Sequence, residues 1–110
     1  MPNTPAPLFV DCFSLCEWLH GRLATERAPL AARLQRHALD LLEWITLALK
    51  DFDRDRRLDL ADECLIKLRV ELRLAAVTGL LEEHQAMHAL DYCDRIGRQI
   101  GGWQRSLDER

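Results

Sequence analysis

The stretch Ile96-Gly97-Arg98-Gln99-Ile100-Gly101-Gly102-Trp103 decides how this chain of 110 residues folds. Three glycines in eight residues disfavour a helix, because each costs about 1 kcal/mol relative to alanine in a helix interior. Apolar residues nevertheless recur through the stretch at alternating steps of four and three, the pattern of a helix packed in a bundle. These residues are Ala89, Cys93, Ile96, Ile100, Trp103 and Leu107. We therefore predict a helix in which Gly97 and Gly101 admit another helix close to the backbone.

The same helical periodicity extends over the rest of the chain. It predicts helices over residues 8–24, 30–50, 57–78 and about 82–106. The first stripe is Leu8, Cys12, Leu15, Leu19 and Leu23, widened by Phe9, Phe13 and Trp18. Gly79 is expected to end the third helix in the left-handed conformation. Short connections between such helices predict an all-α fold, an antiparallel up-down-up-down four-helix bundle.

The domain organisation follows from these helices and from the prolines at the N-terminus. We predict one bundle domain over residues 8–106, with an extended tail at residues 1–7 and a short tail at residues 107–110. The run 51–56 alternates in charge without periodicity and is interpreted as a solvated turn. In the second helix the charged residues and His37 are placed on the polar side.

The predicted third helix carries apolar residues on two opposite faces. Its inner arc is Leu58, Ala61, Leu65, Leu68, Leu72 and Ala75. Its second arc is Ile66, Val70, Leu74 and Val77. A lone bundle buries one face of each helix, so a second arc indicates a contact with a further subunit. We predict a subunit interface made by the second arc with Gly97 and Gly101; the alternative is a helix covered on both sides within its own domain.

Composition and charge bound the function. The net charge of −3 mixes both signs along the chain, so charge alone does not indicate a nucleic-acid binder. No segment approaches the roughly 18 consecutive apolar residues of a membrane span. The N-terminus lacks the basic and apolar regions of a signal peptide, which predicts a cytoplasmic protein. Its four cysteines are then expected to be reduced core residues.

No residue set predicts a reaction. Cys12 and Cys16 lie four apart but on the apolar stripe, without a second pair of ligands. His84 and His88 have the spacing of two metal ligands, yet Gln85 stands where the zinc-protease motif has glutamate. We predict a protein without catalytic residues, cofactor, metal or small-molecule substrate. A metal-dependent enzyme using the two histidines is the weakest of the three functional hypotheses; the other two follow from the family resemblance described below.

Arginines make the remaining candidate surface. Arg69 and Arg73 share one face of the third helix, and three more lie along the fourth: Arg95, Arg98 and Arg105. Guanidinium groups suit bidentate contact with phosphate. Helical spacing pairs Glu71 with Lys67 and Asp94 with Arg98. These arginines are the candidate contacts with nucleic acid or with a protein partner.

The run from Asp94 to Trp103 resembles a family of four-helix-bundle proteins. This family includes the accessory variability determinant of diversity-generating retroelements and proteins encoded in ribosomal-RNA intervening sequences. Three further segments agree with it: residues 33–43, residues 68–75 and Trp18-Leu19. The likeness covers about residues 8–106, and the Ile-Gly-Arg-x-x-Gly-Gly-Trp run is its specific part.

The resemblance implies a pentameric ring of antiparallel bundles around a central channel. It also implies an accessory to a reverse transcriptase, whose positive surface contacts the enzyme and its template RNA and which has no active site. Arg69, Arg73, Arg95 and Arg98 stand at the matching positions. The retroelement members are basic, whereas this chain is not. The competing hypothesis is therefore a protein-only scaffold or interaction module of the same fold.

Overall fold

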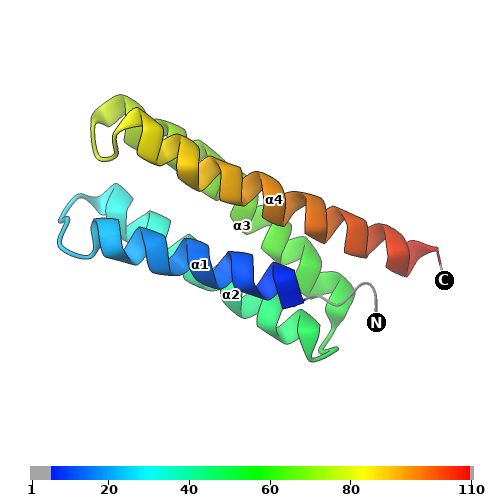
Figure 1. Cartoon of the computed structure of the whole chain (residues 1–110). Helices are drawn as coiled ribbons and strands as arrows, with labels where there is room; N and C mark the ends of the chain where they lie inside the picture. The colour runs from blue at the N-terminus through cyan, green and yellow to red at the C-terminus, as the bar shows by residue number, and fades with distance from the viewer. Residues whose placement is uncertain (1–5, 110) are drawn as a thin grey trace.

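The fold is an all-α four-helix bundle, as predicted. A computed structural model describes residues 6–109 (Figure 1). Its helices are α1 (Ala6–Leu23), α2 (Pro29–Leu49), α3 (Arg54–Thr78) and α4 (Glu83–Asp108). Most of the predicted N-terminal tail, residues 1–5, lies outside the described residues. Gly79 ends α3 with a φ of +83°, which confirms the left-handed glycine expected there.

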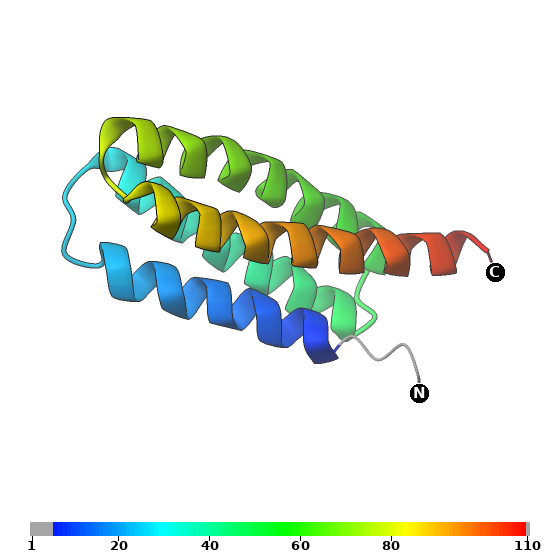
Figure 2. The same cartoon turned by 45° about the horizontal axis from the view of Figure 1, so that its top comes forward.

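Successive helices run in opposite directions around the bundle (Figure 2). Each helix contacts the next one along the chain, and α1 also contacts α4. Within the described residues, the backbone of α1 does not come close to that of α3, nor the backbone of α2 to that of α4. The helices therefore stand at the corners of a square, and each has a face that no other helix covers.

The core is built from the stripes that the spacing predicts. All six residues of the α3 inner arc are fully buried, as are Ile96 and Ile100 of α4. Trp103 is only half-buried, and the guanidinium of Arg54 stacks over its ring at 4.9 Å. No helix in the described part of the chain has both the length and the apolarity needed to cross a membrane.

Three helix boundaries differ from the predicted ones by more than one residue. Helix α1 begins at Ala6, since Pro7 fits the first turn, where no backbone N–H is required. Helix α3 begins at Arg54, so the predicted solvated turn over residues 51–56 is wrong in its second half. Asp51 and Asp53 form the tight turn between α2 and α3. Their φ values are 59° and 53°, in the left-handed region that aspartate tolerates. Helix α4 continues to Asp108 beyond the predicted end.

Candidate functional site

The second arc lies on the uncovered face of α3. Its four side chains, Ile66, Val70, Leu74 and Val77, are between 49% and 84% exposed. The same helix contacts α2 and α4 with its other sides. The alternative of a helix covered on both sides within its own domain is therefore wrong for this chain. An apolar stripe three turns long is left in contact with solvent.

A second apolar surface lies between α1 and α2 and was not predicted. It is a groove of about 350 Å³ lined by Phe13, Cys16, Glu17, His20, Gln35, Leu39 and Leu42. Phe13 and Leu39 are each 51% exposed. The sequence interpretation placed Phe13 with the core stripe, which is wrong, because that side chain lies at the outer edge of the seam between the two helices. We call this surface the α1/α2 groove.

Arg69 crosses from α3 onto α4 instead of facing solvent. Its Nη2 donates to the carbonyl oxygen of Cys93 at 3.4 Å and lies 3.6 Å from Oδ1 of Asp94. A Cβ atom at position 97 would stand 2.9 Å from the same nitrogen. Gly97 therefore leaves room for the Arg69 guanidinium within one chain. The predicted helix-spaced pair of Asp94 with Arg98 is wrong, since Asp94 pairs across the helices.

Gly101 has no such neighbour. Within 4 Å, a Cβ atom there would meet only Nη1 of Arg105, one turn further along the same helix, at 3.5 Å. No other described helix approaches Gly101 in the monomer. Its assignment to a subunit interface stays a prediction, whereas Gly97 is accounted for by Arg69.

Arg95 belongs to a seam of polar and aromatic side chains that joins α4 to α1. Its Nη2 lies 3.7 Å from Oδ1 of Asp11, and its guanidinium stacks over the ring of Tyr92 at 4.5 Å. Gln99 donates to the same Asp11 carboxylate at 2.8 Å. The ring of His88 lies 5.3 Å from that of Tyr92 and 5.0 Å from that of Trp18. These contacts hold Arg95 in place as a structural residue of the bundle.

The other three candidate arginines remain on the surface. Arg73, Arg98 and Arg105 are exposed, and none has an ion pair with a described residue. The five candidate arginines therefore do not form one patch. Two are held by internal partners and three are available to another molecule.

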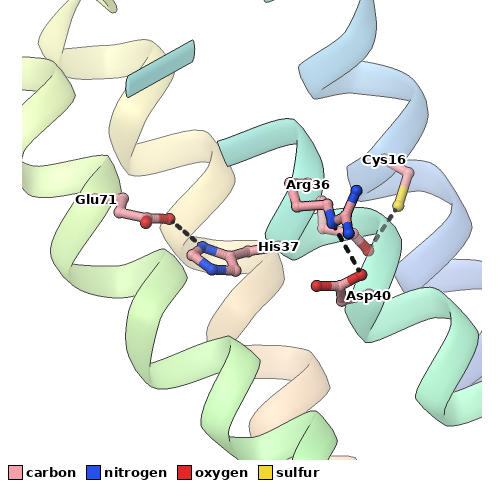
Figure 3. A network of polar contacts seen from close by, with 6 residues as sticks. Cys16, Arg36, His37, Asp40 and Glu71 are labelled. Atoms are coloured by element: carbon pink, nitrogen blue, oxygen red, sulfur yellow. Dashed lines mark hydrogen bonds and ion pairs between the residues drawn. The ribbon is translucent and has the colours of Figure 1, made fainter. Parts of the chain in front are cut away.

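His37 and Glu71 form a polar contact inside the bundle that was missed. Nδ1 of His37 lies 2.8 Å from Oε1 of Glu71, and both side chains are largely buried (Figure 3). Figure 3 shows the imidazole of α2 and the carboxylate of α3 pointing toward one another. The placement of His37 on a polar face and the pairing of Glu71 with Lys67 are both wrong. The contact joins residues 34 positions apart, which local spacing does not reveal.

The cysteines are free thiols, most of them within the core. Burial raises the pKa of Cys93 to about 12 and that of Cys16 to about 11. Burial also raises the pKa of Cys12 far above its ordinary value. The Cys16 thiol donates a hydrogen bond to the carbonyl oxygen of Ala38 at 3.0 Å. At neutral pH these groups are protonated, so they lack the thiolate that nucleophilic attack or metal binding requires.

The two spaced histidines do not converge on shared ligands. Nε2 of His84 lies 3.8 Å from Oε1 of Glu82 at the start of α4, while His88 packs in the aromatic seam. Across residues 6–109, no three His, Cys, Asp or Glu side chains come together in a way that could hold a metal ion. The histidine hypothesis therefore has two candidate ligands and no third.

Comparison with protein-family models, with curated proteins and with solved structures finds no match to this chain.

Proposed function

We propose that this chain is a cytoplasmic, non-enzymatic helical-bundle protein that associates with copies of itself and works as a scaffold for other macromolecules. The observation that carries the proposal is the exposed second arc of α3. Apolar side chains in a continuous exposed row mark an interaction site more often than an idle surface. The pentameric ring implied by the family resemblance is the assembly we expect, with Ile66, Val70, Leu74 and Val77 in the subunit contact.

The proposal is tested by the mass of the protein in solution. Multi-angle light scattering of the purified chain should give a multiple of the 12.7 kDa monomer mass. Val70→Glu should give the monomer mass, because a carboxylate buried in an apolar contact is not compensated. Phe52→Glu is the matched control, since Phe52 is as exposed as Val70 but lies in the turn before α3. A wild-type chain of monomer mass at micromolar concentration would refute the proposal.

A second candidate function is that of a retroelement accessory factor, which binds a reverse transcriptase and RNA. The observation that favours it is the set of exposed arginines that have no ion pair with a described residue, Arg73, Arg98 and Arg105. Arginine in this situation is free to contact phosphate. The internal contacts of Arg69 and Arg95 count against a larger patch, and so does the net charge of −3.

Fluorescence anisotropy with a labelled single-stranded RNA tests the second candidate. If Arg98 and Arg105 contact phosphates, binding weakens with salt at a slope of about −0.7 per phosphate neutralised. The double variant Arg98→Glu with Arg105→Glu should abolish binding, whereas Arg36→Glu on the far side of the bundle should not. Absence of RNA binding at low salt would leave the scaffold function alone.

A further inference from the structure

We infer that the second arc of one copy packs into the α1/α2 groove of the next copy, so that two unlike surfaces meet at each contact. The inference rests on the proposed self-association and adds the identity of the surface that covers the arc. Both surfaces are apolar at their centre and exposed in the single chain. They lie on different sides of the bundle, because α3 stands diagonally across from α1 (Figure 2).

The two surfaces complement each other in shape. The second arc is a ridge on a single helix, and the groove is a hollow between two helices. At 1.5 Å per residue, the arc runs about 16 Å from Ile66 to Val77. Each wall of the groove spans about 10 Å, from Phe13 to His20 on α1 and over residues 35–42 on α2. The groove therefore has room for about two turns of the arc, and an amphipathic helix laid into an apolar groove is a recurring mode of recognition.

Acidic side chains border the α1/α2 groove, and basic side chains flank the middle of the second arc, while the acidic Asp62 and Glu63 lie at its Ile66 end. Glu17 lines the groove. Glu43 follows the groove residue Leu42 and lies near the Cys16 thiol, whose pKa its negative charge helps to raise. Lys67 and Arg73 flank the second arc on its two sides. None of the side chains of Glu17, Glu43, Lys67 and Arg73 has an ion pair with a described residue. Docking would bring Glu17 and Glu43 of one copy toward Lys67 and Arg73 of the next, which favours the pairing of the groove with the second arc.

A symmetric contact of α3 with α3 fits these observations less well. It would place Lys67 and Arg73 of both copies around one contact, where exposed acidic residues lie only at the Ile66 end of each arc. It would also leave the α1/α2 groove uncovered. A contact between unlike surfaces leaves one free surface of each kind after every addition, so association continues into a closed ring or an open filament.

Mixing two variants that each lack one surface tests the inference directly. Leu39→Glu places a charge in the groove, and Val70→Glu places one on the arc; both positions are more than half exposed, so both chains should fold. Each charge should weaken association on the order of 100-fold or more. Each variant alone should therefore scatter as a monomer. An equimolar mixture should give a dimer of twice the 12.7 kDa mass, since one intact arc then meets one intact groove.

The possible outcomes separate this inference from the proposed function. Circular dichroism first confirms that both variants keep the helical content of the wild type. If Leu39→Glu keeps the wild-type mass while Val70→Glu is a monomer, self-association stands and the groove is not the partner of the arc. If both are monomers but the mixture forms no dimer, the pairing of the two surfaces is also overturned. A wild-type chain that is itself a monomer refutes the proposed function and the inference with it.

Discussion

Helix α3 carries two apolar faces of similar composition that end in different surroundings. The inner arc, with Leu65, Leu68 and Leu72, is fully buried against the other helices. The second arc, with Val70 and Val77 among its members, is exposed to solvent in the single chain. Helical spacing identifies both faces equally well. It does not show which face is covered by the same chain, because that depends on how many helices the fold supplies.

The difference assigns separate tasks to the two faces. Removing apolar area from water contributes about 25 cal/mol per Å², and the inner arc gains this contribution when the chain folds. The second arc gains it only when another molecule arrives. Substitutions on the inner arc should therefore change folding, whereas substitutions on the second arc should change association.

Leu68→Ala is the largest expected effect and the strongest test of this contrast. Leu68 is fully buried, so truncation removes apolar contacts and leaves a cavity. We expect a loss of about 2 to 5 kcal/mol in the free energy of unfolding. Urea denaturation followed by circular dichroism measures it, in the Val70→Glu background so that association does not contribute. A loss below about 1 kcal/mol would show that the inner arc does not stabilise the fold as described.

The inner arc also shows how far sequence reasoning extends. Every residue from Leu58 to Ala75 in that arc was predicted to be buried and is buried. The prediction succeeds because burial along one helix depends mainly on the 3.6-residue repeat. Spacing alone left two predictions open for the second arc, and the structure decided between them, since its exposure depends on the absence of a fifth element on that side.

Contacts between helices were the part that spacing could not provide. Helical spacing proposes partners three or four residues away, yet Glu71 pairs with His37 and Asp94 pairs with Arg69. Both true partners come from a neighbouring helix. The α1/α2 groove was missed for the same reason. Phe13 and Leu39 belong to different helices, and they line one groove only after the chain has folded.

Glu71→Ala tests the polar contact between α3 and α2, which lies between the two apolar faces of α3. The carboxylate is the partner of the buried His37 imidazole, and its loss leaves that nitrogen without a described hydrogen bond. We expect about 1 to 3 kcal/mol less stability. Glu63→Ala is the control, since Glu63 is exposed on the same helix and has no described partner. If the two variants lose the same stability, the contact with His37 contributes nothing.

Gly97→Ala tests the contact between α3 and α4, where the Arg69 guanidinium lies beside Gly97. Alanine gains about 1 kcal/mol over glycine in a helix interior. Its Cβ would displace the flexible end of Arg69 and weaken the pair with Asp94, a partly exposed contact worth about 0 to 1 kcal/mol. The net change should lie between about 0 and 1 kcal/mol of added stability.

The control for this variant is Gly21→Ala in α1, where a Cβ would meet no atom within 4 Å. That substitution lies in the last turn of α1 and should gain up to about 1 kcal/mol from helix propensity. The difference between the two variants in urea denaturation reports the cost of moving Arg69. A marked loss of stability for Gly97→Ala would show that the guanidinium is fixed rather than adjustable.

Val70→Ala is the smallest expected effect and the closest counterpart of Leu68→Ala. Both replace a branched apolar residue of α3 by alanine, but Val70 is 62% exposed. In the monomer the change should add up to about 0.5 kcal/mol, because alanine has the higher helix propensity and little burial is lost. Urea denaturation at a concentration where light scattering gives the monomer mass measures this value.

The same substitution should weaken association at higher concentration, since the side chain that meets the neighbouring copy is shortened. Opposite signs for two neighbouring positions of one helix would establish the division between the faces, whereas a loss comparable to that of Leu68→Ala would mean that the second arc supports the fold of the single chain.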